Sequence, residues 1–445
     1  MNTAAPAPRL SGEIVALPGA SPARSALLRA ALAAGLPTAR DENWKYASLR
    51  ALDRQVLVAP TSIDDAAAVA AAAALPARLE GFTRIVFVDG LYSAALSGAP
   101  LPAVATLLSE TQLQAGAMAP PVGPASTAPQ PATPRAIAAG VPVELRFSQI
   151  NAALSNQGLR ITIPAASRAA IEVVFVAAAD AAIAASHPAL QVELAEGATL
   201  DLVERQLGAG ALATFTNADV RVRAGRDSRL HHHRLQQLGP RSRHFETLVL
   251  EADDRAQCEI LTVASGGLAV RSTAWVTLAG QDSSLAWNAV ALADRTQVND
   301  AFVRVEHLGR GAQTQQLFRG IAAGRARVAF NGHMVVRESA AGAASDQSLR
   351  ALLAGGEAEA DLRPQLEIYI DEVRASHGAT VGKLDEQALF YLLSRGIGRV
   401  TAEALLKWAF VADVVARIRI PALRRQAEAA MAAQLRDVVD VGDPP

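Results

Sequence analysis

The segment "EGATLDL" at residues 196–202 is the first copy of a short pattern that returns at regular intervals. In each copy, turn-forming residues precede a small residue, which opens a run of alternating polar and apolar positions. The further copies are "GRDSRLH" (225–231), "DDRAQCEI" (253–260), "QDSSLAW" (281–287) and "GRGAQTQQL" (309–317). Spacings of 30, 28, 28 and 28 residues separate the small residues, which are Ala198, Ser228, Ala256, Ser284 and Ala312.

A fixed period of this length indicates stacked coils rather than a single closed sheet. Each coil would bury its inward-facing side chains on the next. Two coils of fourteen residues per period, or one long coil, fit the spacing equally well. We therefore predict a mainly β protein with a β-solenoid core, and a β-sandwich is the alternative fold.

Both ends of the chain show helical patterns instead. Residues 22–80 are predicted to be mostly helical, with Ser21 as N-cap, Pro22 at the first helical position and Gly35 at the end of the first helix. A strand with a turn at Asp89 and Gly90 follows. A segment rich in Pro, Ala, Gly and Ser then predicts a linker.

The C-terminal part returns to helical periodicity. Asp385 or Leu384 is predicted to start a helix that Gly396 ends. Thr401 is predicted to cap a second helix, and Pro421 to open a third. The predicted organisation is a mostly helical N-terminal domain (1–114), a Pro/Ala-rich linker (115–135), the β core (136–383) and a C-terminal helical domain (384–445).

Composition narrows the functional classes. The chain has 445 residues and a formal net charge of -1, so no overall field attracts it to nucleic acid or to an anionic membrane. It has one cysteine, Cys258, which allows no disulfide within the chain and cannot supply the four thiolates that usually hold an iron–sulfur cluster. No secretion signal or membrane span is evident, so we expect a cytoplasmic protein.

A phosphate-binding loop is the first candidate site, because Gly378, Gly382 and Lys383 follow a predicted strand at 365–373. A Walker A loop needs four residues between its glycines and Ser or Thr after the lysine. Here the glycines enclose only three residues, and Leu384 follows the lysine. The pattern therefore argues against an ATP site and leaves a glycine-bearing turn that carries His377.

The segment around this histidine resembles a known family. Residues 364–397, "PQLEIYIDEVRASHGATVGKLDEQALFYLLSRGI", are similar to the signature of the SufB/SufD family of iron–sulfur cluster assembly proteins. "LPTARDENWKYASLR" (36–50) and "VAFNGHMVVRESA" (328–340) resemble two further family elements. SufB would carry H-E-A-T-T-S where this chain has His377 to Gly382, so the resemblance favours the SufD branch.

The resemblance implies a right-handed parallel β-helix between N-terminal and C-terminal α-helical domains. It also implies a non-enzymatic scaffold of the SUF system, with no catalytic residues, that joins SufB and the ATPase SufC and can form a homodimer when alone. A transient iron–sulfur cluster would be shared with SufB at their interface, and none would be held tightly by this chain alone. No nucleic acid or membrane partner is implied.

The resemblance also assigns residues. His377 corresponds to the family's candidate cluster ligand, and neutral imidazole is able to bind iron. Relatives often have cysteine two residues earlier, where this chain has Ala375, so a thiol has no role there. Contacts to SufC are expected from the C-terminal helical domain, with Phe390, Tyr391 and Arg395 as the candidate residues.

Other conspicuous residues favour structural interpretations. The histidine run 231–233 would place His232 inward as a hydrogen-bonded core residue, with its two neighbours on the opposite face. Cys258 is predicted to be buried and inert. Asp371 and Glu372 would be a solvated strand end rather than a carboxylate pair.

Aromatic residues near the two chain ends are likewise assigned to packing. Trp44, Lys45 and Tyr46 are expected to anchor the N-terminal helices to the core. Phe390, Tyr391 and Trp408 are core residues by default, although some can face SufC. Two other functions remain open at this point, a β-helix enzyme acting on polysaccharide and a SufB-like subunit that nucleates the cluster itself.

Overall fold

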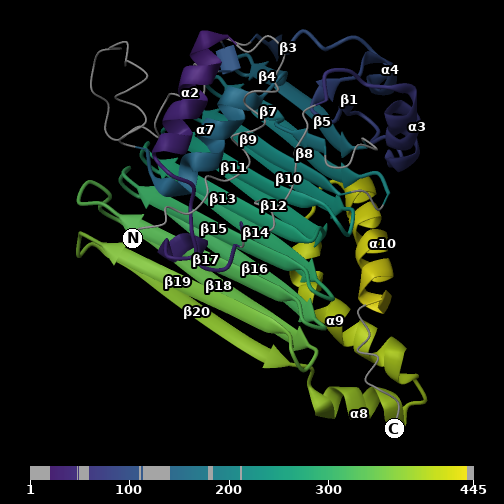
Figure 1. Cartoon of the computed structure of the whole chain (residues 1–445). Coiled ribbons are helices and arrows are strands. Elements are labelled where there is room, and N and C mark those ends of the chain that lie inside the picture. Colours follow the sequence, from purple (N-terminus) through teal and green to yellow (C-terminus); the bar gives the residue numbers. More distant parts are fainter. Residues whose placement is uncertain are drawn as a thin grey trace, which may run out of the picture.

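The computed structural model describes residues 21–47, 49, 60–109, 112–113, 141–178, 184–210 and 213–437. In this part of the chain, the strands wind into a parallel solenoid with helices along its sides (Figure 1). The predicted β-helix core with helices at both ends is confirmed, and the β-sandwich alternative is wrong. The predicted linker at 115–135 lies outside the described residues.

The strands form two sheets that face each other across the core. Sheet I has the order β2-β1-β5-β8-β10-β12-β14-β16-β18-β20, and its pairings are parallel except that of β1 with β2. Its strands are β1 (Thr83–Val88), β2 (Leu91–Tyr92), β5 (Arg168–Ala177), β8 (Thr199–Gly208), β10 (Arg229–Leu238), β12 (Gln257–Gly266), β14 (Ser284–Ala293), β16 (Gln313–Ala323), β18 (Ala343–Ala354) and β20 (Val373–Lys383).

Sheet II has the order β19-β17-β15-β13-β11-β9-β7-β4-β3, with β6 on β9. Only β3 pairs antiparallel, on β4. Its strands are β3 (Ala105–Leu108), β4 (Gly158–Ile163), β6 (Ala184–Ser186), β7 (Ala189–Leu194), β9 (Thr214–Ala224), β11 (Arg243–Ala252), β13 (Ala269–Leu278), β15 (Val298–His307), β17 (Arg327–Val336) and β19 (Glu359–Ile368).

One sequence period makes one long coil with a strand in each sheet, as in the path from β8 through β9 to β10. The alternative of two coils of fourteen residues per period is wrong. The strand register also corrects one residue of the repeat. Ser284 pairs with Gln257 as the first residue of its strand, so the equivalent of the buried Ala256 is Ser283, which is also buried. The expected equivalence of Ser284 is wrong because the coil that starts with β12 is one residue shorter than the coil before it. Its connection between the two sheets, from β12 to β13, has two residues where the connection from β10 to β11 has four, and the connection before β14 has five residues where the one before β12 has four.

The turns that precede sheet I explain why the repeat carries a small residue. Asp227, Arg255, Asp282 and Gly311 have left-handed backbone angles, with φ between 53° and 66°. Each directs its N–H to a carbonyl of the next coil, as Arg255 does to Gln281. The residue that follows is fully buried in each case, so only a short side chain fits beneath the turn.

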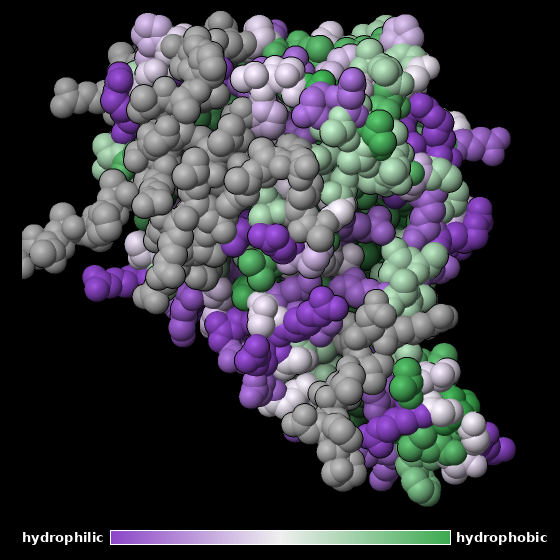
Figure 2. All heavy atoms as spheres, turned by 45° about the vertical axis from the view of Figure 1, so that its right-hand side comes forward, coloured by the Kyte–Doolittle hydropathy of each residue, from purple (hydrophilic) through white to green (hydrophobic). Residues whose placement is uncertain are grey.

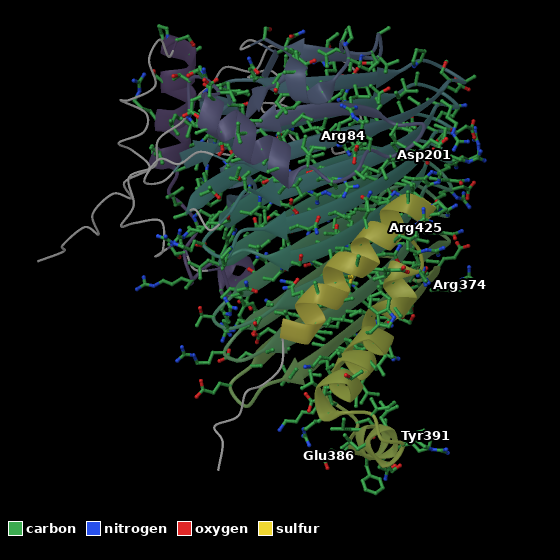
Figure 3. All side chains as sticks on the ribbon, turned by 90° about the vertical axis from the view of Figure 1, so that its right-hand side faces the viewer. Arg84, Asp201, Arg374, Glu386, Tyr391 and Arg425 are labelled. Atoms are coloured by element: carbon green, nitrogen blue, oxygen red, sulfur yellow. The ribbon has the colours of Figure 1, made fainter. Side chains whose placement is uncertain are left out.

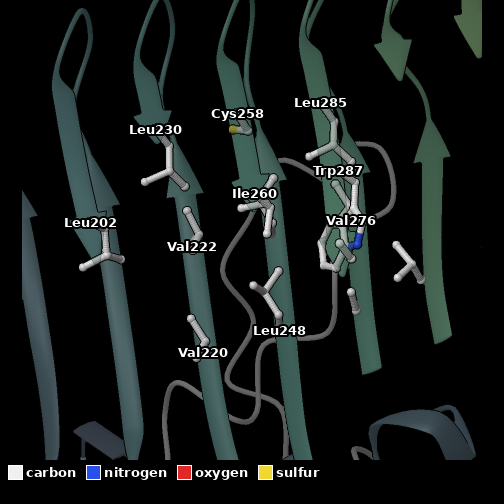
Figure 4. Packing of buried hydrophobic residues seen from close by; sticks show 14 of the residues in the cluster. Leu202, Val220, Val222, Leu230, Leu248, Cys258, Ile260, Val276, Leu285 and Trp287 are labelled. Atoms are coloured by element: carbon white, nitrogen blue, oxygen red, sulfur yellow. The ribbon is translucent and has the colours of Figure 1, made fainter. Parts of the chain in front are cut away.

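Aliphatic side chains fill the space between the two sheets (Figure 4). They stack in columns because partners in a parallel, in-register ladder point to the same side. One such column contains Leu230, Cys258 and Leu285, which are paired residues of β10, β12 and β14. The apolar area buried in these columns is the main source of the core's stability.

The N-terminal helices are α2 (Pro22–Ala33), α3 (Asp65–Ala74), α4 (Ala94–Ser97) and α7 (Arg146–Leu154), with short 3-10 turns at Glu42–Trp44 and Val143–Leu145. The Ser21 hydroxyl accepts from the N–H of Arg24, and Gly35 has φ +83°, so the predicted start and end of α2 are confirmed. Helices α2 and α7 pack together against β9 and β11 of sheet II (Figure 1).

The C-terminal helices are α8 (Glu386–Ser394), α9 (Arg399–Val415) and α10 (Pro421–Asp437). Asp385 caps α8 and Pro421 opens α10, as predicted. The prediction for Thr401 is wrong, because Gly398, three residues earlier, is the N-cap of α9. Helices α9 and α10 cover the outer face of sheet I, while α8 projects beyond it (Figure 1).

Candidate functional site

The last coil of the solenoid is open to solvent. Strands β20 and β19 end sheets I and II, and no described strand pairs with their outer edges. Every residue from Arg374 to Lys383 is exposed. Three apolar side chains, Ile368, Tyr369 and Val381, are 41%, 52% and 45% exposed at this end. We call β19 and β20 with their connection (359–383) the open edge.

His377 lies in the middle of β20, so its predicted position in a glycine-bearing turn is wrong. Strand β19 ends at Ile368, the turn occupies residues 369–372, and the backbone from Val373 to Lys383 continues as one strand on β18. Gly378 has no left-handed φ and adopts the extended conformation. Pairing along β18 satisfies backbone groups that a turn at this place would leave without partners.

The register sets the direction of the His377 side chain. His377 pairs with Gln347 of β18, which in turn pairs with Gln316 of β16, and both glutamines are buried on the inner side of sheet I. His377 therefore lies on the inner side of the last coil, with nothing stacked above it in the described chain. Ala375 is two residues away and shares this face, so the site presents an imidazole with no thiol beside it.

The outer face of sheet I carries a groove of about 670 Å³ near the starts of its strands. Ser376 donates its hydroxyl to Asp346, and Arg374 lines the same groove (Figure 3). At the other side of the groove, Arg419 forms an ion pair with Glu259 at 2.7 Å. This polar groove is on the face opposite to His377 and does not contribute to its surroundings.

The histidine run 231–233 is held by neighbouring carboxylates and by the C-terminal helices. His231 contacts Asp201 with Nδ1 at 2.8 Å, and His232 contacts Glu204 with Nε2 at 3.0 Å. His233 accepts from the backbone N–H of Arg419 at 3.4 Å. His232 is fully buried, which confirms the prediction of a hydrogen-bonded core histidine.

A buried charge network surrounds His232 and joins the two sheets. Arg234 on β10 donates to Glu204 on β8 and to Glu246 on β11, at 3.1 and 2.7 Å. His244 contacts Glu246 at 3.0 Å. Burial alone would raise the pKa of the Glu204 and Glu246 carboxyl groups, but the charge of Arg234 and the hydrogen bonds from the histidines lower it by more than burial raises it. The pKa of Glu204 is held well below its usual range, and that of Glu246 is lowered to about 2.

Cys258 is buried in the aliphatic column, as predicted. Burial raises the pKa of its thiol to about 12, so the thiolate that binds metal does not form at neutral pH.

Asp371 and Glu372 are exposed in the turn between β19 and β20. The predicted solvated carboxylates are confirmed, although they lie in a turn and not at a strand end. Among the described residues, no group of three or more His, Cys, Asp or Glu side chains is placed to hold a metal ion.

Trp44 is buried between α7 and sheet II, which confirms its anchoring role. Its ring lies 5.4 Å from that of Phe147, and the guanidinium of Arg271 lies 4.4 Å from its centroid. Lys45 is exposed, and Tyr46 is half-buried. The three residues of this motif therefore differ in their environment, and the tryptophan provides most of the buried contact.

The default interpretation of Phe390 and Tyr391 as core residues is wrong. They are 71% and 56% exposed on α8, where only Leu389 is buried. Arg395 is also exposed, with its guanidinium 5.2 Å from the Tyr391 ring centroid. Helix α8 packs mainly on α9 and extends past the solenoid, and its two aromatic side chains are left uncovered (Figure 3). Trp408 of α9 is partly buried against the sheet I cluster.

The network of Arg234, Glu204 and Glu246 was not predicted, because charged residues inside a coil break the alternation of polar and apolar positions that marks a strand. Only the strand register brings them together. Gln316 and Gln347 are a different case. Their inward direction follows from the repeat once the position of Ala312 is fixed, since Gln316 lies four residues after this inward residue.

Comparison with known proteins identifies the family. The sequence profile described as "SUF system FeS cluster assembly, SufBD core domain" matches residues 175–410. The iron–sulfur cluster assembly protein SufD of Escherichia coli is 30% identical over 412 residues, which cover 91% of each chain. The chain belongs to the SufB/SufD family.

Two further SufB/SufD relatives support this membership. The SufBD family protein slr0076 of Synechocystis is 25% identical over 87% of this chain and 85% of its own. The SufD of Bacillus subtilis is 33% identical over 29% of this chain and 30% of its own. The long match to a SufD confirms the SufD branch, and the chain is thus a subunit of the SUF system. In the described residues, no helix has the length and hydropathy of a membrane span.

Proposed function

We propose that this chain is the scaffold subunit that supports a nascent iron–sulfur cluster at its interface with a SufB-type subunit, and that it couples this interface to the SufC ATPase. The observation that carries the proposal is the position of His377. It is an exposed imidazole on the inner side of the last coil, at a strand edge that has no described partner.

The open edge is suited to pairing with another chain. A long strand with free backbone groups on one side is a template for strand addition, and proteins that do not use such an edge usually blunt it. Ile368, Tyr369 and Val381 add exposed apolar contacts beside the free edge. A second solenoid docked here would cover His377 and bring its own side chains next to the imidazole.

The chain cannot complete a cluster site alone. Thiolates are the usual cluster ligands, and here Cys258 is buried with a raised pKa, while Ala375 stands beside the histidine. The cluster is therefore a cargo for which this chain supplies one nitrogen ligand. The partner subunit supplies the thiolates.

Helix α8 is the proposed contact for the ATPase subunit. Phe390, Tyr391 and Arg395 present two aromatic rings and a guanidinium on a helix that lies beyond the solenoid. Aromatic and arginine side chains are enriched at protein interfaces, where they contribute most of the binding energy. Figure 2 shows hydrophobic side chains among polar ones on this projecting lower end of the molecule.

The test is the His377→Ala variant in the complex with SufB-type and SufC subunits. Folding and complex formation should be retained, because the side chain is exposed and lacks packing partners above it. Cluster formation, measured as iron and sulfide content and visible absorbance, should be lost. The matched control is His231→Ala, an imidazole five strands away in sheet I and thus roughly 24 Å distant. Wild-type cluster yield from the His377→Ala complex would refute the ligand role.

A further inference from the structure

The glutamine beneath His377 is held in a fixed orientation. Gln347 donates from Nε2 to Oε1 of Gln316 at 2.9 Å and to the backbone carbonyl of Gly332 at 3.0 Å. A backbone carbonyl can only accept, so the Gln347 amide group cannot be flipped without losing this bond. The Nε2 nitrogen of Gln347 therefore points toward Gln316 on β16 and toward Gly332 on sheet II.

The backbone of Gly332 is adapted to this arrangement. A Cβ atom at this position would lie 2.5 Å from Oε1 of Gln316 and 2.7 Å from Nε2 of Gln347. Only glycine leaves room for the two amide groups to cross the interior and reach its carbonyl. The two glutamines and Gly332 thus form a cross-sheet amide ladder one coil below His377.

The oxygen of Gln347 remains available. Oε1 is buried, and no described donor forms a hydrogen bond with it. Because the carboxamide is planar, an oxygen opposite the bound nitrogen faces β20, where the register partner of Gln347 is His377. An oxygen in this position can accept a hydrogen bond but cannot donate one.

We propose that Gln347 is a positioning residue that fixes the tautomer and ring orientation of His377. An imidazole N–H that donates to the Gln347 oxygen leaves the lone pair of the second ring nitrogen facing away from the coil, toward a docked partner. Metal-binding histidines are commonly set by such a hydrogen bond from their other nitrogen. This inference rests on the proposed function of His377 and extends it to the residue beneath.

The first test needs neither iron nor a partner. In protein labelled with ¹⁵N-histidine, long-range ¹H–¹⁵N correlation distinguishes Nδ1–H from Nε2–H, and His377→Ala identifies the signal among the eight histidines. At a pH where the ring is neutral, the wild type should show one tautomer. Gln347→Met, which keeps the side-chain length and removes the acceptor, should show both.

Two further variants make the result specific. Gly332→Ala should also give a mixture of both His377 tautomers. Its methyl group would displace the two glutamine amides, although Gln347 itself is not substituted. Gln315→Met is the matched control, since Gln315 is exposed on the outer face of the neighbouring strand and should leave the single tautomer intact. A thermal unfolding curve of each variant checks that the chain is folded.

The outcomes separate this inference from the proposed function. Loss of the Gln347 oxygen should also weaken iron binding in the complex by roughly tenfold to a hundredfold, as other hydrogen-bond partners of metal ligands do. A single unchanged tautomer in Gln347→Met, or a mixture in the wild type, would overturn the positioning role while leaving the His377→Ala result untouched. Normal cluster assembly by His377→Ala would overturn the ligand role, whatever the tautomer.

Discussion

The two ends of the solenoid are built in opposite ways. At the N-terminal end, the sheets finish with the short antiparallel strands β2 and β3, and α3 and α4 pack beside β1. At the C-terminal end, both sheets stop at full-length parallel strands, and β20 is exposed along almost its whole length. In contrast, five of the six residues of β1 are buried.

The contrast indicates which end of the solenoid has free backbone groups for pairing with another chain. Short strands and covering helices are ways in which proteins prevent unwanted edge pairing. The chain applies them at one end only, although both ends expose the same kind of backbone groups. The open edge is therefore where the proposed assembly would take place, and the interior behind it has to be stable without a further coil.

The largest expected effect comes from breaking the interior network. Arg234→Met should destabilise the chain by about 3–5 kcal/mol, because it leaves the Glu204 and Glu246 carboxylates buried without their shared cation. The free energy of unfolding in urea measures this loss. Arg374→Met at the open edge is the matched variant, and it should change stability by no more than about 0.5 kcal/mol. Equal losses would mean that the interior network contributes no more to stability than the open edge does.

The second largest expected effect is a pH dependence of stability, and it also comes from a residue in the interior of the solenoid. Burial lowers the pKa of His307, which contacts Thr314 at 2.7 Å, from 6.5 to about 4. The unfolded chain then binds a proton more readily than the folded chain, so stability falls as the pH falls from 6.5 toward 4. The loss is about 3 kcal/mol for this range.

His307→Gln should remove this part of the acid sensitivity. The measurement is the free energy of unfolding of the variant and the wild type at several pH values between 7 and 4. The carboxyl of Glu246, with a pKa of about 2, contributes stability that is lost only below its ordinary pKa of 4.5. Parallel curves for the variant and the wild type above pH 4.5 would contradict the role of His307.

A substitution at the open edge is expected to have a smaller effect on the stability of the chain. It should weaken association with a partner instead. Val381→Asp places a charge on an exposed position, so stability should change by no more than about 0.5 kcal/mol. Binding to a SufB-type subunit should weaken at least about tenfold, because docking would bury an unpaired carboxylate. Val69→Asp, a 71% exposed residue on α3 at the closed end, is the control. Binding unchanged by Val381→Asp would place the interface elsewhere.

The smallest effect on the chain itself is expected for α8. Phe390→Ala should leave both stability and open-edge association unchanged, since the ring is exposed on a helix that packs mainly on α9. Co-purification with the ATPase subunit should decrease. If the ATPase subunit is recovered at the wild-type level, another surface of the chain carries this contact.

The sequence repeat was sufficient to predict the coils, because each one needs a left-handed turn and a small residue beneath it. It was not sufficient to count residues per coil. Ser284 was misaligned by one position, since a turn can lose a residue while the strands keep their register. The helix ends at Ser21, Asp385 and Pro421 were predictable because caps act locally, whereas the start of α9 at Gly398–Arg399 has no capping side chain.

For the candidate site, resemblance supplied a residue, and the geometry around that residue did not follow from the sequence. His377 was singled out by resemblance, but glycines near it suggested a turn where the chain forms an edge strand. Whether an extended glycine belongs to a strand depends on the presence of β18 beside it, which is a non-local fact. The orientation of Gln347 depends in the same way on Gly332, fifteen residues away and on the other sheet.

The attachment of the C-terminal helices has a mechanical consequence. Arg205 of β8 bonds to Gln426 of α10, Glu259 of β12 pairs with Arg419 in the connection between α9 and α10, and Arg319 of β16 pairs with Asp413 of α9 at 2.8 Å. These ties are spread over five consecutive strands of sheet I, so α9 and α10 cannot slide along it. A force applied to α8 would therefore reach sheet I at two places, through α9 and α10 along the stack and through β20, which is separated from α8 by two residues.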